Sequence, residues 1–235
     1  MTRICTICAR GGSKGVKNKN LRELLGIPLI AHSIMQAQKS GLFDVIAVSS
    51  DSEDILQVAM EYGVDFAIKR PAELATDTAA KLPVIQHCVS EVEQLSNLQF
   101  DMMIDIDATS PLRTIEDLKN AVRMLGQHED AYNLITAAPA RRSPYFNLVE
   151  DRADGYVGLS KPLETAIFRR QDAPKSYDMN ASIYVWNRDC FFNEQSVFTD
   201  KTILYVMPEE RSQDIDSELD FEIVQLLAEK RGSLV

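Results

Sequence analysis

Short apolar segments rich in β-forming residues alternate with amphipathic segments along most of the 235-residue chain. Pro28 opens one amphipathic segment, and Gly41 and Gly63 follow the last residues of two of them, as at helix ends. This alternation is typical of βα units around a mostly parallel central sheet, so we predict an α/β fold. The predicted strands are 3–9, 45–49, 65–68, 102–106, 133–138, 181–186 and 203–207, and the predicted helices are 28–40, 53–62, 83–95, 116–125 and 218–231. The last helix is expected to bury Leu219, Ile223, Leu226 and Leu227.

The alternation breaks between 139 and 179, where prolines are scattered among arginines and aromatic residues. A chain of 235 residues is longer than one typical domain of about 150 residues and shorter than two. We therefore predict one domain, formed by 1–138 and 181–235, with an inserted arm at 139–180.

Composition and charge narrow the function classes. Hydrophobic residues make up 45% of the chain and charged residues 26%, values typical of soluble globular proteins. The net charge of −10 would repel nucleic-acid phosphates, so we expect no nucleic-acid partner. No apolar run reaches the roughly 18 residues that a membrane helix needs, so we expect no membrane contact and a cytoplasmic protein.

The cysteines and histidines suggest no site of their own. Four cysteines are too few for a disulfide framework. Cys5 and Cys8 form a C-x-x-C pair, but in a strand residues three apart face opposite sides, so they should not share a metal. The histidines His32, His87 and His128 fall in or beside predicted helices and near no other motif, so we expect them to be structural or surface residues with no catalytic role.

A glycine-rich segment, Ala-Arg-Gly-Gly-Ser-Lys-Gly at 9–15, directly follows the first predicted strand. Its adjacent glycines Gly11 and Gly12 allow the backbone to approach a ligand closely, with N–H groups directed at phosphate oxygens. The end of a first strand is where open α/β sheets bind anions, and the spacing matches neither a Walker A nor a G-x-G-x-x-G motif. Cations flank the turn at Arg10, Lys14 and Lys19. The alternative is a solvated basic turn.

A pair of acids, Asp214 and Asp216, precedes the last predicted helix. In an extended segment residues two apart face the same side, so both carboxylates can converge on Mg²⁺ while Ile215 points inward. The alternative is helix capping, because Ser217 and Asp220 fit a capping box. Capping accounts for one acid of the pair and not for both.

Two further groups are weaker candidates. Asp105 and Asp107 repeat the same spacing at the end of a buried strand, and buried acids need a polar or cationic partner, which could be ligand or protein. Arg169, Arg170 and Gln171 lie in the arm and could bind a substrate carboxylate, although exposed arginines are more often plain surface.

Five motifs, taken in order, resemble the CMP-sialic acid synthetase (acylneuraminate cytidylyltransferase) family, and together they span nearly the whole chain. They are Ala-Arg-Gly-Gly-Ser-Lys-Gly at 9–15 with Lys19-Asn20, Arg-Pro-Ala-Glu-Leu-Ala at 70–75, Thr-Ser-Pro-Leu-Arg at 109–113, Asn-Ala-Ser-Ile-Tyr at 180–184 and Asp-Ile-Asp-Ser-Glu-Leu-Asp-Phe at 214–221. The resemblance implies a Rossmann-like nucleotidyltransferase domain at 1–138 and 181–235, with a dimerisation and substrate arm at 139–180. The implied reaction joins CTP to a nine-carbon 2-keto sugar acid and releases pyrophosphate, with Mg²⁺ as cofactor, in a homodimer.

The resemblance also implies roles for individual residues. The groups expected to be catalytic are Arg10, Lys19, Asp214 and Asp216, the last two as Mg²⁺ ligands. The groups expected to bind CTP are Arg10, Gly11, Gly12, Ser13, Lys14, Lys19, Asn20, Arg70 and Asp107. Those expected around the sugar are Asp107, Thr109, Ser110, Arg170, Gln171, Asn180, Tyr184 and Phe198, with Arg141 and Arg142 reaching across from the partner subunit.

Two positions depart from the family pattern. Asp107-Ala108 stands where Gln-Pro is usual, so a group that donates and accepts is replaced by one that only accepts, and its donor must differ too. That donor could be an amide N–H or a hydroxyl of the sugar side chain. Ala80-Lys81 stands where a serine is often found. The run at 105–108, with Pro-Ala-Arg-Arg at 139–142, resembles the bacterial branch that activates legionaminic acid. Alternatives are an N-acetylneuraminate, pseudaminate or 3-deoxy-manno-octulosonate cytidylyltransferase, and a non-catalytic nucleotide-binding module.

Overall fold

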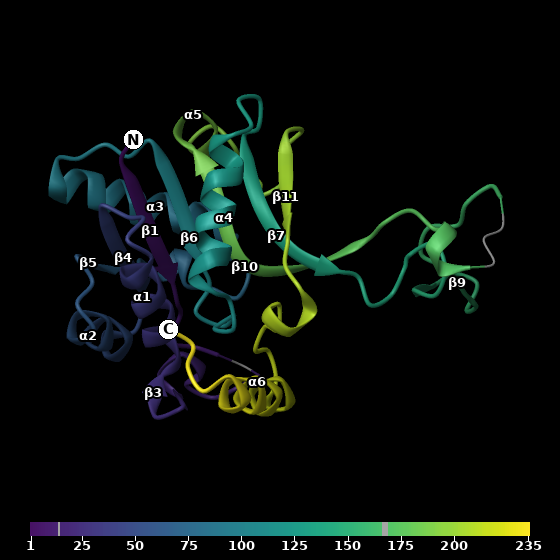
Figure 1. Ribbon diagram of the computed structural model, residues 1–235, viewed down its shortest axis with the longest axis horizontal. Coiled ribbons are helices and arrows are strands. Elements are labelled where there is room, and N and C mark those ends of the chain that lie inside the picture. The colour runs from purple at the N-terminus through teal and green to yellow at the C-terminus, as the bar shows by residue number, and fades with distance from the viewer. Residues whose placement is uncertain (14, 166–168) are drawn as a thin grey trace.

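A seven-stranded sheet forms the centre of the computed structural model, which describes residues 1–13, 15–165 and 169–235 (Figure 1). The strand order is β11-β7-β10-β6-β1-β4-β5. Neighbours pair in parallel except at β10, which runs antiparallel to both β6 and β7. The mostly parallel sheet is therefore confirmed. The strands are β1 (Arg3–Cys8), β4 (Val45–Ser50), β5 (Phe66–Lys69), β6 (Met102–Ile106), β7 (Asn133–Pro139), β10 (Tyr177–Asn187) and β11 (Thr202–Val206).

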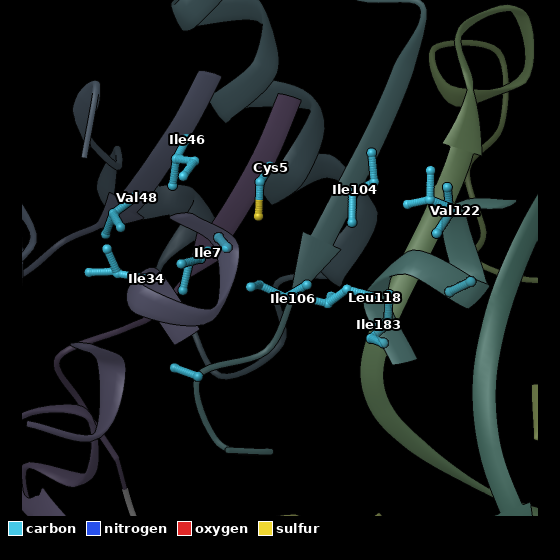
Figure 2. Packing of buried hydrophobic residues seen from close by; sticks show 14 of the residues in the cluster. Cys5, Ile7, Ile34, Ile46, Val48, Ile104, Ile106, Leu118, Val122 and Ile183 are labelled. Atoms are coloured by element: carbon cyan, nitrogen blue, oxygen red, sulfur yellow. The ribbon is translucent and has the colours of Figure 1, made fainter. Parts of the chain in front are cut away.

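Helices cover both faces of the sheet. Because side chains alternate along a strand, Ile4 of β1 packs on one face and Cys5 on the other. Three helices pack against the face of the sheet that carries Cys5, and Ile34 and Leu118 are among their buried side chains. Figure 2 shows part of this packing. The helices on that face are α1 (Leu29–Ser40), α2 (Glu53–Glu61) and α4 (Ile115–Gly126), and those on the other are α3 (Lys81–Ser96) and the short α5 (Arg188–Phe191).

The final helix, α6 (Glu218–Arg231), has the predicted bounds but a different buried face. Phe221, Val224 and Ala228 are buried, whereas Leu219 is 64% exposed. Of the predicted face, Ile223 and Leu226 are also exposed, and Leu227 is partly buried. The prediction was wrong because the helix carries apolar residues on two sides. Its neighbours from outside the helix, Val16, Leu24, Leu29, Leu112 and Ile215, decide which side packs.

The 139–180 segment leaves the sheet after β7 and returns in β10, projecting away from the body in Figure 1. Its outer part carries an antiparallel hairpin of β8 (Val149–Asp151) and β9 (Val157–Leu159), which the sequence pattern did not predict. A second small hairpin, β2 (Glu23–Leu24) with β3 (Ile27–Pro28), was also missed. None of the described helices is long and apolar enough to cross a membrane.

Candidate active site

A cleft of about 500 Å³ opens at the carboxyl ends of the parallel strands. Ala9 follows β1, Arg70 follows β5 and Asp107 follows β6, and all three line it. Open α/β sheets bind ligands at this end of their strands. The lining residues are Cys8, Ala9, Arg10, Ser13, Gly15, Lys19, Asn20, Arg70, Leu74, Thr76, Asp77, Ala79, Lys81, Val84, Asp107, Thr109, Asp214 and Asp216. The glycine-rich loop and the paired acids, about 200 positions apart, therefore share one cleft.

Direct contacts join these two segments. Lys19 Nζ donates to the Ile215 carbonyl and lies 3.3 Å from Asp216 Oδ1. A Cβ on Gly15 would lie 1.8 Å from the Asp216 carbonyl oxygen, so only glycine fits there. Ile215 is fully buried, as predicted, and its N–H donates to the Thr109 carbonyl over 3.0 Å.

Gly15→Ala is expected to lower the free energy of unfolding by about 2 kcal/mol, because the new methyl group would force apart the loop and the 214–216 segment. Gly12→Ala is the matched control, since a Cβ there meets nothing within 4 Å. Chemical denaturation of both variants measures the difference. Equal stability of the two would show that Gly15 is not a point of close packing.

The cations of the cleft are paired within the chain. Arg10 Nη1 forms an ion pair of 2.6 Å with Asp77, and Lys19 is paired with Asp216. Arg70 is buried, and its Nη2 donates to the Ser49 carbonyl over 2.7 Å. The cationic groups of Arg10 and Lys19 are therefore already held in place. A polyanion that binds them would compete with the carboxylates of Asp77 and Asp216.

The loop itself is held by neighbouring side chains. Asn20 Nδ2 donates to the Arg10 carbonyl over 3.0 Å. The Gly11 N–H donates to Asp51 Oδ1 over 2.9 Å, so in this conformation it is not directed at a ligand. Gly12 is exposed, and Lys14 lies outside the described residues. Asp51 and Asp77 were missed by the sequence analysis, because no spacing rule ties either of them to the loop.

Lys81 and Thr109 provide the hydrogen-bond donors to Asp107. Lys81 Nζ lies 2.7 Å from Asp107 Oδ2 and 3.1 Å from Asp105 Oδ2. Asp107 Oδ1 accepts from the Thr109 N–H and hydroxyl. Burial opposes ionisation, but Lys81 and the Thr109 donors outweigh it and lower the Asp107 pKa to about 2. The two positions that depart from the family pattern are thus in contact.

Asp214 and Asp216 suit a divalent cation. Burial, and then the nearby Asp107 charge, raise the pKa of Asp214 to about 6, because together they outweigh the Thr109 hydrogen bond and the charge of Lys19. Asp214 Oδ1 also lies within hydrogen-bond distance of the Thr109 hydroxyl, which can donate to only one of Asp107 and Asp214 at a time. Carboxylate oxygens are the ligands that Mg²⁺ prefers, usually one or two together with substrate phosphates. Helix capping does not use the pair, because Ser217 and Asp220 form the capping box of α6. Within the described ranges, no cluster of three His, Cys, Asp or Glu side chains could hold a metal.

The Asp214 pKa of about 6 predicts that divalent-cation binding weakens as the pH falls below 6, by up to about tenfold per pH unit, because the protonated carboxyl is a poor ligand. Mn²⁺ affinity measured by electron paramagnetic resonance between pH 5 and 7.5 checks this. Asp214→Asn is expected to remove the pH dependence. Affinity that is constant over this range would contradict the assignment.

The residues expected around the sugar are only partly brought together. Thr109 lines the cleft, and Ser110 is buried beside it. Asn180 is buried and donates to Ser212 Oγ over 2.9 Å. Tyr184 is buried and stacked on Trp186. Gln171 and Arg142 line a separate cavity of about 440 Å³ at the base of the arm, and the backbone N–H of Arg141 donates to Asp178. The side chain of Arg170 lies outside the described part of the structure.

Phe198 lies near the amino ends of the parallel strands, whereas the cleft is at their carboxyl ends. It follows β10, whose last residue Asn187 pairs with Met102 at the start of β6. Val197 accepts a hydrogen bond from Asn133 at the start of β7. Because β10 is antiparallel to its neighbours, the chain after it returns to their amino ends. Placing Phe198 beside the sugar was therefore wrong for the site formed by its own chain.

Two of the three histidines bond to backbone carbonyls, and the two cysteines of the C-x-x-C pair face opposite sides of the sheet, as expected. His32 is buried and bonded to the Leu24 carbonyl at 2.8 Å, and His128 is bonded to the Met124 carbonyl at 2.7 Å. Cys5 and Cys8 pack on opposite faces of the sheet.

Comparisons with known proteins agree with the geometry of the cleft. A family model described as cytidylyltransferase matches residues 4–231. The chain belongs to this cytidylyltransferase family. It is 50% identical over 224 residues to the CMP-N,N'-diacetyllegionaminic acid synthase of Campylobacter jejuni, covering 95% of this chain and 94% of that protein. It is 49% identical over 229 residues to post-translational flagellin modification protein B of Campylobacter coli, covering 97% and 96%.

The fold has a solved counterpart. A structure of CMP:2-keto-3-deoxy-manno-octonic acid synthetase complexed with CTP superposes with a TM-score of 0.71, covering 98% of this chain and 100% of that one. The sequence identity is 16%, so this likeness speaks for the fold alone. The α/β nucleotidyltransferase architecture predicted for this chain is confirmed.

Proposed function

We propose that the protein transfers the cytidylyl group of CTP to a nine-carbon 2-keto sugar acid, giving the CMP-sugar and pyrophosphate. The observation that carries this proposal is the contact between the glycine-rich loop and the 214–216 segment in one cleft. Cations on one side and carboxylates on the other suit a triphosphate bound together with a divalent ion. Among sugar acids we favour N,N'-diacetyllegionaminic acid, because the relative of that name is 50% identical over nearly its whole length.

In the proposed reaction the anomeric hydroxyl oxygen of the sugar acid forms a bond to the α-phosphorus of CTP. The bond from that phosphorus to its bridging oxygen breaks, pyrophosphate leaves with the electron pair, and the hydroxyl proton passes to solvent water. Negative charge is spread over the phosphate oxygens in such a transition state, so positioned cations provide most of the stabilisation. No side chain is needed as a covalent nucleophile.

The chain's own residues then have the following roles. Lys19 and Arg10 exchange their carboxylate partners for phosphate oxygens, and buried Arg70 helps to shape the nucleotide side of the cleft. Asp214 and Asp216 would hold Mg²⁺, which when bound would neutralise phosphate charge and lower the pKa of the attacking hydroxyl. Burial raises the Tyr184 pKa to about 12, so this phenol stays protonated and is not the base.

We also propose that the arm at 139–180 is a dimerisation element. Exposed apolar side chains, including Val149, Tyr156 and Val157, are gathered on its hairpin and would be covered by a second copy. Arg142 and Gln171 at the arm's base would then complete the partner's sugar site. We place the protein in the cytoplasm, in keeping with four free cysteines.

The test is pyrophosphate release from CTP and Mg²⁺ with a panel of acids: N,N'-diacetyllegionaminic, N-acetylneuraminic, pseudaminic and 3-deoxy-manno-octulosonic. The highest kcat/KM is expected for N,N'-diacetyllegionaminic acid. A higher value for another acid would replace the proposed sugar. Release with none of them, by folded protein that binds CTP, would favour a non-catalytic nucleotide-binding module.

A further inference from the structure

The floor of the cleft contains a lysine to which the proposed reaction gives no role. Lys81 is the first residue of α3, and its side chain is 26% exposed into the cleft. Its Nζ forms ion pairs with Asp107 and with fully buried Asp105, and it lies 4.8 Å from the centre of the Tyr184 ring. These are the only ion pairs that Asp105 and Asp107 form within the described ranges. Its cationic group is thus directed at protein carboxylates.

A short chain of contacts leads from Lys81 to the proposed metal site. Asp107 binds Lys81 through Oδ2, and its Oδ1 accepts from the Thr109 hydroxyl over 2.9 Å. The same hydroxyl contacts Asp214 Oδ1. A hydroxyl has one proton, so it can donate to only one of these carboxylates at a time. Asp107 and Asp214 are therefore neighbouring acids on either side of a single hydroxyl.

Without Lys81, Asp107 would be a competing metal ligand. Its side chain is 19% exposed and lines the cleft, so a divalent cation could reach it together with Asp214. Adding carboxylate ligands raises the affinity of a site for hard divalent cations. An ion held by Asp107 and Asp214 would not be the one that Asp214 and Asp216 share. Asp105 is no competitor, because it is fully buried and its Oδ1 accepts from the Thr6 hydroxyl.

We propose that Lys81 is a positioning residue: by holding Asp107 in an ion pair, it excludes Asp107 from metal binding and directs the divalent cation to Asp214 and Asp216. This inference rests on the proposed function for the use of a metal. It assigns Lys81 no contact with CTP or sugar.

The test measures Mn²⁺ binding to the protein without nucleotide, by electron paramagnetic resonance, alongside turnover. Lys81→Met is expected to bind Mn²⁺ at least about fivefold more tightly while kcat falls at least about tenfold, with the KM for CTP changed less than about threefold. Lys81→Arg keeps the charge and should retain the Mn²⁺ affinity of the parent protein. Lys39→Met, on the exposed side of α1, is the matched control and should change neither quantity.

The double variant Lys81→Met/Asp107→Asn tests whether Lys81 acts through Asp107 or directly on the substrates. If Lys81 acts by neutralising Asp107, removing both should return Mn²⁺ affinity to within about twofold of the parent and recover part of kcat. A double variant as impaired as Lys81→Met would mean that Lys81 acts on the substrates directly, and would overturn the proposal. Unchanged or weaker Mn²⁺ binding by folded Lys81→Met would also overturn it. If the parent protein shows no turnover, the proposed function fails, whereas the Mn²⁺ measurements still decide the role of Lys81.

Discussion

Asp216→Asn is expected to lower kcat by about 10³-fold, because it removes one of the two carboxylates that hold the metal. The Asp216 side chain is 81% exposed and does not cap α6, so the fold should tolerate the change. CTP binding without metal should persist or tighten. Asp216 is paired with Lys19 at 3.3 Å, and losing that carboxylate leaves the lysine free to bind phosphate.

Two measurements check this expectation: steady-state turnover at saturating Mg²⁺, and CTP titration by calorimetry in the presence of a chelator. Asp200→Asn, in an exposed turn near the opposite edge of the sheet, is the control and should behave as the parent protein. Turnover within about threefold of the parent would remove Asp216 from the metal site, and loss of metal-free CTP binding would show that it binds the nucleotide directly.

Lys19→Met is expected to have the second largest effect, lowering kcat/KM by about 10²- to 10³-fold. The Lys19 side chain is 12% exposed, and its Nζ is held by the Ile215 carbonyl and Asp216 at the mouth of the cleft. The lost charge is the one closest to the metal-binding segment. Unlike Asp216→Asn, this variant should weaken CTP binding with and without Mg²⁺, because the lysine acts on phosphate and not on the metal.

Lys17→Met is the matched control, since Lys17 lies in the same loop but is exposed and does not line the cleft. It should keep kcat/KM within about twofold of the parent. Equal losses in the Lys17 and Lys19 variants would mean that general loop charge, rather than a positioned ammonium group, supports the reaction.

The glycine-rich loop and the pair of acids could be predicted because each is indicated by a short sequence pattern. Adjacent glycines after a first strand, and two acids flanking an apolar residue, indicate their geometry from spacing alone, and Ile215 is buried as that spacing requires. Other features depended on tertiary packing. The choice between the two apolar sides of α6 was made by Val16, Leu24 and the residues around them. The misplacement of Phe198 came from the direction of β10, which local sequence does not determine.

Lys81 shows a different limit. Its position next to Ala80 was visible as a departure from the family pattern, and so was the aspartate at 107. Their contact at 2.7 Å joins residues 26 positions apart and depends on how the start of α3 packs over the end of β6. Because aspartate can only accept hydrogen bonds, a changed donor could be predicted and was expected on the sugar, but only the fold shows that protein groups donate to Asp107.

A crystal structure of the protein with CTP and Mn²⁺, with the metal located by anomalous scattering, would show whether the glycine-rich loop and the acid pair bind nucleotide and metal together. The proposed site predicts a Mn²⁺ ion ligated by Asp214, Asp216 and a CTP phosphate oxygen, with the triphosphate against Arg10 and Lys19. A triphosphate bound outside this cleft, or a metal held without Asp214 and Asp216, would contradict it.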